Sequence, residues 1–217
     1  MQKIMFNDRF GLTKAVLDGA KTMTRRAVGN HMTDDDIAAY MKGHKEVAYK
    51  LAPYKIGEIV SIAQRYNELS WNKSFYDRLC SMCERLPQYE LAGWYNKMFV
   101  RADLMPHQIQ ITDIKVERLQ DINEEDCTEE GIIPVTWRQY LKQDWNDLSP
   151  QKYIDHDVWT LPVFKEGILD TWAESHPDEF MADSPQTAFA VLIFKMMGKK
   201  VWDSNPFVFA YTFKLIK

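Results

Sequence analysis

The pattern of apolar and polar residues predicts strands that lie far apart in the sequence, with helices between them. The expected strands cover residues 3–6, 59–63, 109–116 and 207–215. The third strand alternates and then changes phase near Asp113, which indicates a β-bulge. The last strand alternates aromatic side chains with Val208 and Ala210, so its aromatic face should lie in the core. Strands separated by helices favour an α+β fold built on a mixed sheet or barrel.

Helical periodicity occupies the intervals between these strands. Leu12, Ala15 and Val16 share one face of a first helix, and Gly19 stands where a helix-ending residue with positive φ is expected. Residues 132–160 have no clear period and are interpreted as a loop with short helices. Further helices are expected over residues 31–50, 69–86, 124–130, 162–175 and 184–195.

The composition is that of an ordinary globular chain. The 217 residues are 46% hydrophobic and 27% charged, and we interpret them as one domain that needs neither disulfides nor a metal for stability. Three cysteines argue against a secreted disulfide framework. Because no apolar run suits a signal peptide or a membrane span, we expect a cytoplasmic protein without a membrane partner.

Positive charge is concentrated near the start of the chain. The net charge is −4, yet residues 1–30 carry six cations against Asp8 and Asp18. A local basic patch on an acidic body suits a small anionic ligand or a short piece of nucleic acid. It does not suit long, non-specific tracking along a nucleic-acid backbone.

The basic segment 19–26 is the strongest candidate for a ligand site. It places Lys21, Arg25 and Arg26 within eight residues and directly after a predicted helix. Lys21 could act as a base or nucleophile with a lowered pKa, or as a fixed cation. The helix C-terminus behind it favours the charged form, so the cation role is preferred. The alternative is a solvated lysine.

The neighbouring residues of this segment extend the candidate site. Thr22 and Thr24 could each supply a hydroxyl, although joint action of Lys21 and Thr24 requires a turn between them, because side chains of an extended chain alternate. We expect one of Arg25 and Arg26 to pair with an internal acid and the other to hold a phosphate or carboxylate.

A second wall of the site is expected after the strand 59–63. Gln64 could read a base edge, since it carries both a donor and an acceptor. Tyr66, if exposed, could stack on a base, as could Trp71 and Trp94. The alternative for Gln64 is a polar side chain at a strand end.

The sequence predicts no metal site and no cofactor. Cys80 and Cys83 have a spacing that zinc sites use, but a closed zinc site requires four ligands, and buried core cysteines are the simpler interpretation. No glycine-rich phosphate loop and no nucleophile elbow is present.

Five ordered segments resemble the ASCH domain, a family related to the RNA-binding PUA domain, in its phage-like branch. The first is Gly19-x-Lys21-x-x-x-x-Arg26. The others are Pro53-Tyr54-x-Ile56-Gly57-Glu58, Met105-Pro106, the run from Ile111 to Ile122, and Trp202-x-x-Asn205-Pro206-x-Val208. Residues 1–217 would then form a single ASCH/PUA-like domain with helical insertions at about 29–50, 68–97 and 133–200.

The resemblance implies an α+β fold, a PUA-like mixed β-barrel with a cleft beside the basic motif, that binds RNA or a modified nucleoside. It would use Lys21, Thr22, Thr24, Arg25 and Arg26.

One branch of the family hydrolyses the amide of N4-acetylcytidine with the motif Lys, a nearby Thr and a Glu. Lys21 and Thr24 match as catalytic residues, whereas Gln64 stands where the Glu is expected after the strand 59–63. An amidohydrolase is therefore the alternative function. A protein-interaction adaptor of a phage or mobile element, using the inserted segments, is a third.

Overall fold

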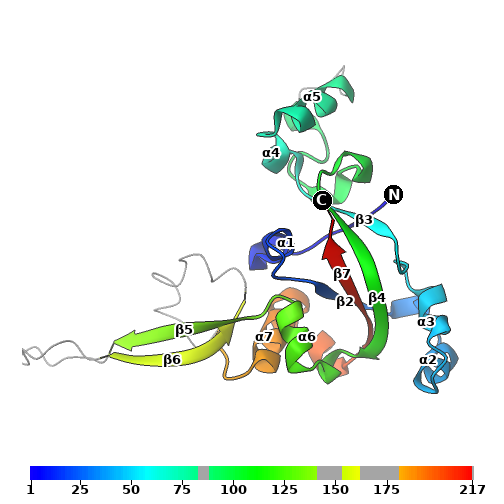
Figure 1. The fold of residues 1–217 in the computed structure, drawn as a ribbon, viewed down its shortest axis with the longest axis vertical. Helices are drawn as coiled ribbons and strands as arrows, with labels where there is room; N and C mark the ends of the chain where they lie inside the picture. The colour runs from blue at the N-terminus through cyan, green and yellow to red at the C-terminus, as the bar shows by residue number, and fades with distance from the viewer. Residues whose placement is uncertain (83–87, 141–152, 162–180, 217) are drawn as a thin grey trace, which may run out of the picture.

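The body of the protein is an open, five-stranded mixed sheet. The computed structural model describes residues 1–82, 88–140, 153–161 and 181–216 (Figure 1). The sheet has the order β1-β3-β4-β7-β2, in which only the pairing of β1 with β3 is parallel. Its strands are β1 (Gln2–Ile4), β2 (Met23–Ala27), β3 (Ile59–Ile62), β4 (Gln108–Arg118) and β7 (Phe207–Leu215).

Eight α-helices are described around this sheet. They are α1 (Leu12–Leu17), α2 (Asp34–Met41), α3 (Glu46–Leu51), α4 (Tyr66–Leu69), α5 (Lys73–Met82), α6 (Glu124–Glu129), α7 (Pro185–Met197) and α8 (Lys199–Ser204). Figure 1 shows α2 and α3 at one end of the body and α4 and α5 at another. An α+β fold was predicted, and this class is confirmed.

The strands that the structure describes do not close into a barrel. β1 and β2 are the two edges of the sheet, and no ladder joins them. β1 has only three residues, which leaves little backbone to pair. Between the edges, the side chain of Arg26 donates to the Met5 carbonyl at 2.5 Å. In a closed barrel, a row of backbone hydrogen bonds would join β1 to β2. Here the hydrogen bond from the Arg26 side chain to the Met5 carbonyl lies between these edges instead.

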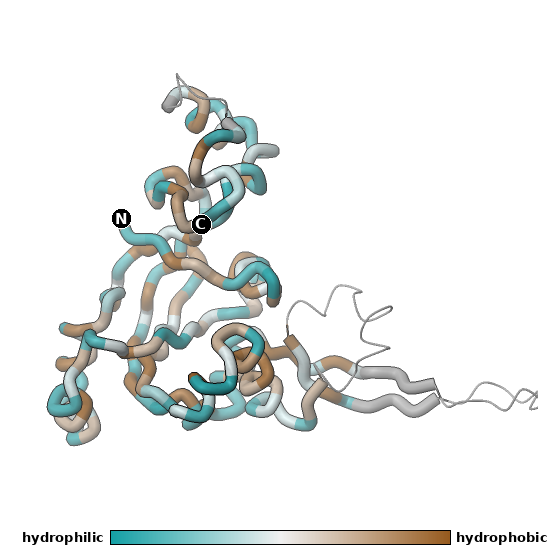
Figure 2. Tube along the Cα trace, turned by 180° about the vertical axis from the view of Figure 1, so that it is seen from behind, coloured by the Kyte–Doolittle hydropathy of each residue, from teal (hydrophilic) through white to brown (hydrophobic). Residues whose placement is uncertain are grey.

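The aromatic strand predicted at the end of the chain is confirmed as a core strand. Phe209, Tyr211 and Phe213 of β7 are buried, and so are Val208 and Ala210, which point to the other face of the sheet. Figure 2 shows both hydrophobic and hydrophilic residues along the strands. β7 pairs with both β4 and β2, which places it in the interior of the sheet. The predicted bulge is confirmed by a shift in register between Ile111 and Asp113.

A smaller hydrophobic cluster lies beside the main core. It joins the residues after β3 to α5 and to the segment before β4. Phe75 and Leu79, four residues apart on α5, are each 1% exposed there, so this face of the helix is buried. The last part of the predicted helix, 83–86, lies outside the described residues. The cluster consists of Ala63, Tyr66, Leu69, Phe75, Leu79, Val100, Leu104 and Met105.

The prediction of a loop with short helices for residues 132–160 was wrong. Two antiparallel strands occur there, β5 (Ile133–Tyr140) and β6 (Tyr153–Thr160), and the hairpin extends away from the body (Figure 1). Both strands carry β-branched and aromatic residues, but interspersed Pro134, Asp155 and Asp157 interrupt the apolar pattern. The helix predicted over 162–175 lies outside the described residues.

The helix predicted over 184–195 is confirmed by α7. Ser184 caps it through a hydrogen bond to the Thr187 amide, and Pro185 occupies the first turn. No helix in the described ranges has both the length and the apolar character needed to cross a membrane.

Burial in the sheet should determine the stability of the fold. Ile111→Ala, at a fully buried position of β4, should lower the free energy of unfolding by about 2–5 kcal/mol because it leaves a cavity. Ile59→Ala is the matched control on the neighbouring strand β3, where the side chain is 42% exposed, and should cost less than about 1 kcal/mol. Urea unfolding measures both. Similar losses would contradict the packing described.

Candidate functional site

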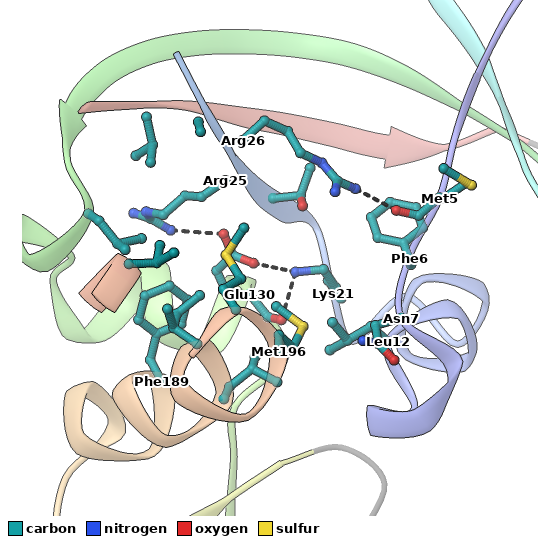
Figure 3. Close-up of a pocket in the computed structure, with 18 of the residues that line it drawn as sticks. Met5, Phe6, Asn7, Leu12, Lys21, Arg25, Arg26, Glu130, Phe189 and Met196 are labelled. Atoms are coloured by element: carbon teal, nitrogen blue, oxygen red, sulfur yellow. Dashed lines mark hydrogen bonds and ion pairs between the residues drawn. The ribbon is translucent and has the colours of Figure 1, made fainter. Parts of the chain in front are cut away.

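A pocket of about 560 Å³ lies beside the basic segment. Its walls come from the segment after β1, from β2, and from α7 and α8 (Figure 3). Leu12, Phe189, Leu192 and Ile193 give it an apolar wall. Lys21 and Glu130 line the same cavity, so a largely apolar pocket also contains charged side chains. Small-molecule sites typically combine an apolar lining with a few polar groups.

Lys21 reaches the pocket because the chain turns sharply after α1. Gly19 has φ 75°, as predicted for a helix-ending glycine, and the amides of Ala20 and Lys21 both donate to the Ala15 carbonyl at 2.9 Å. The Lys21 side chain is 1% exposed. Its Nζ donates to the Glu130 carbonyl at 2.8 Å and to the Glu130 carboxylate, as Figure 3 shows.

Burial determines the protonation of Lys21. It lowers the pKa of the Lys21 ammonium, and the Glu130 carboxylate offsets only part of that effect. The helix C-terminus was expected to favour the charged form, but loss of solvation outweighs it. The neutral amine of Lys21 is therefore populated at a lower pH than in an exposed lysine.

Glu130 is a charged residue of the pocket that the sequence analysis did not predict. It follows α6, whose N-terminus is capped by the Asn123 side chain, and it precedes Gly131 with φ 98°. The Thr22 amide donates to the Glu129 carbonyl at 2.8 Å, which holds the end of α6 against the basic segment. The only signal in the sequence was a carboxylate directly before a helix-ending glycine.

Arg25 lies at the centre of a buried ionic cluster. Its side chain is 2% exposed and pairs with Glu117 at 2.5 Å, Asp126 at 2.6 Å and Glu130 at 3.1 Å. Burial alone would lower the pKa of Arg25, but the three carboxylates together raise it. Lys115 joins the cluster through Asp126 and Glu117. Arg25 is thus the arginine that pairs with internal acids.

Thr24 and Arg26 line the same pocket, whereas Thr22 does not. Within the described part of the chain, the Thr24 hydroxyl makes no hydrogen bond and Arg26 has no carboxylate partner. The Arg26 guanidinium contacts the Met5 carbonyl and lies 5.9 Å from the centre of the Phe6 ring. Lys21 precedes β2, which explains how it and Thr24 reach one cavity despite the alternation of side chains along the strand.

The structure does not bring Gln64 and Tyr66 to this pocket. Both follow β3, which β4 and β7 separate from β2. Gln64 is 8% exposed and contacts His107 Nδ1 at 2.5 Å. The Tyr66 hydroxyl accepts a hydrogen bond from the Arg101 amide at 2.9 Å, within the smaller hydrophobic cluster. Trp71 is 93% exposed, but it does not line the pocket either.

Neither of the two cysteines that the structure describes gives a sign of a metal site. Cys127 is fully buried, and burial raises the pKa of its thiol to about 12, so it is an inert core residue. Cys80 lies on α5, and Cys83 falls outside the described residues. No group of three metal-binding side chains converges in the described ranges.

Comparison of the chain with family models, with curated proteins and with solved structures finds no match. The resemblance to the ASCH domain therefore stays a prediction. The pocket combines a buried ion pair between Lys21 and Glu130 with the partly exposed guanidinium of Arg26. The Thr24 hydroxyl and an apolar wall complete its lining.

The ionic cluster should be necessary for folding. Arg25→Met leaves Glu117, Asp126 and Glu130 facing one another without their shared cation, and should lower the free energy of unfolding by about 3–5 kcal/mol at neutral pH.

Arg101→Met is the matched control for this change. Arg101 pairs with Asp103 at 2.6 Å, but both side chains are more than half exposed, so the loss should be below about 1 kcal/mol. Urea unfolding at neutral pH measures both variants. An equal loss of unfolding free energy in the two would contradict the central position of Arg25 in the ionic cluster.

Proposed function

We propose that the chain binds a single nucleoside-sized ligand in the Lys21 pocket. The observation that carries this proposal is a cavity of about 560 Å³ that combines an apolar wall with the polar groups of Lys21, Thr24 and Arg26. The volume is typical of small-molecule sites. A planar base suits the apolar wall, and its carbonyl and amino groups suit the polar side.

The burial of Lys21 and Arg25 favours a small ligand over extended RNA. Both side chains are almost fully buried and bonded to carboxylates, so neither is available to follow a phosphate backbone. Only small groups that enter the pocket can meet Lys21. Of the proposed partners, a modified nucleoside therefore agrees better with the geometry than a long RNA.

We also propose that the chain is of the ASCH, PUA-like type. Support comes from the signature segment itself: Gly19 ends a helix, and Lys21 and Arg26 both line one pocket. A cleft beside the basic motif is what the resemblance implies.

Loss of the Thr24 hydroxyl should weaken ligand binding. Thr24→Val keeps the shape of the side chain and removes one hydrogen bond, which should weaken binding of N4-acetylcytidine or cytidine by about 1 kcal/mol, or roughly fivefold. Thr22→Val is the matched control, because Thr22 lies two residues away and does not line the pocket. Titration calorimetry measures both. Equal affinities in the two variants would place the ligand elsewhere.

Hydrolysis of an amide on a modified base is the second candidate function. The specific observation in its favour is that a carboxylate does meet Lys21, although it comes from Glu130 and not from position 64. Lys21, Thr24 and Glu130 all line the pocket, so an acid/base pair and a hydroxyl share one space. In this proposal Glu130 supplies the carboxylate that the resemblance expects at position 64, where the chain has Gln64.

These residues suggest a balanced route for the reaction. A water molecule attacks the acyl carbonyl while the Lys21–Glu130 pair accepts its proton, and the Thr24 hydroxyl donates to the oxygen that gains negative charge. The C–N bond then breaks, and the pair returns the proton to the departing amine. Acetate and cytidine would be the products from N4-acetylcytidine.

Removal of the carboxylate should abolish most of this activity. Glu130→Gln keeps the size of the side chain but removes the negative charge that stabilises the Lys21 ammonium once the amine has accepted the proton, so release of cytidine from N4-acetylcytidine should fall by roughly 100-fold or more. In the native protein the rate should rise with pH, because the neutral amine of Lys21 becomes populated above its lowered pKa. Chromatography of the products measures the rate. Native protein without turnover would reject hydrolysis and leave the binding proposal standing.

A further inference from the structure

The charged groups at the base of the pocket, Lys21, Arg25 and Glu130, belong to an electrically balanced ionic cluster. Lys21, Arg25 and Lys115 provide three cations, and each contacts at least one of three carboxylates. Those carboxylates belong to Glu117, Asp126 and Glu130. Because each charge has a partner, the base offers little net attraction to an anion.

The rim of the pocket carries an excess of positive charge. Arg26 is partly exposed and bonds to the Met5 carbonyl, which is uncharged. Arg9 is exposed, and its guanidinium lies 5.6 Å from the centre of the Phe10 ring. Within the described residues, neither guanidinium has a carboxylate within ion-pair distance. Both line the pocket.

The one acid on this rim is already occupied. Asp8 pairs with Lys97 at 2.7 Å, and Arg65 lies 3.8 Å away. The Thr13 hydroxyl also donates to Asp8 at 2.5 Å. Asp8 therefore does not neutralise Arg9 or Arg26.

The two unpaired guanidiniums belong to neighbouring segments. Arg26 donates to Met5, and residues 5–9 run along the pocket from Met5 to Arg9. In Figure 3, the Arg26 guanidinium turns toward Met5 and away from the contact between Lys21 and Glu130. The Arg26 guanidinium thus lies apart from the contact between Lys21 and Glu130, as a separate subsite for another part of one ligand would.

We propose that the ligand carries a phosphomonoester, held by Arg9 and Arg26 at the rim. This inference rests on the proposed binding of a nucleoside-sized molecule and names its class, a nucleoside monophosphate. Planar guanidiniums bind phosphate oxygens through paired, charge-assisted hydrogen bonds. The base would lie on the apolar wall with its reactive group at Lys21, and the phosphate would remain near solvent.

The test compares cytidine 5′-monophosphate with cytidine by titration calorimetry. The monophosphate should bind about 10- to 100-fold more tightly, as expected for one or two charge-assisted hydrogen bonds. This ratio should fall toward one in Arg9→Gln/Arg26→Gln and should weaken at high salt. Arg101→Gln removes an exposed arginine outside the pocket and should keep the native ratio. If the double variant does not fold, Arg9→Gln alone should still lower the ratio.

The results distinguish the phosphate subsite from nucleoside binding. If cytidine binds but the monophosphate binds no more tightly, the phosphate subsite is rejected and nucleoside binding survives. If cytidine does not bind but ribose 5-phosphate binds more tightly than ribose, and does so through Arg9 and Arg26, the phosphate subsite stands and nucleoside binding fails. A preference for phosphate that the double variant retains would also reject the subsite.

Discussion

The contact between Arg25 and three carboxylates holds the structure around the pocket together. It links β2, which carries Arg25, to Glu117 on β4. It also links β2 to Asp126 within α6 and to Glu130 at the C-cap of that helix. Arg25 and Lys115 are both in register with Ala210 of β7, a small residue that leaves room for a long side chain to cross to β4. This shared cation offsets the repulsion between three carboxylates that lie close together in a buried site. The position of Glu130 beside Lys21 follows from the same cluster.

The pocket lies where the sheet fails to close. One wall comes from residues directly after the edge strand β1, and another comes from the edge strand β2. α7 covers the space with apolar side chains such as Phe189 and Leu192. A continuous ladder between the two edges would occupy this space with paired backbone. The pocket therefore depends on the gap between the two edge strands, β1 and β2.

Local signals in the sequence predicted the elements, but long-range contacts determined the site. Gly19, the bulge near Asp113 and the aromatic face of β7 were predictable because each depends on neighbours along the chain. Gln64 was assigned to the pocket by its place after a strand, although strand order separates it from β2. Only the glycine that follows it, Gly131, distinguished Glu130 from the acids of α6. The hairpin of β5 and β6 was missed because polar residues and a proline interrupt its alternation.

The pairing of Lys21 with Glu130 spans 109 residues of sequence. In a ribosome-bound chain that has not yet emerged as far as Glu130, the Lys21 ammonium lacks this carboxylate. Burying the unpaired ammonium would be costly, so the segment around Lys21 should stay solvated. The cavity is therefore a late product of chain assembly, because the loop between the two residues must close first. Shortened products that stop inside this loop would lack the site altogether, even where their local helices and turns are intact.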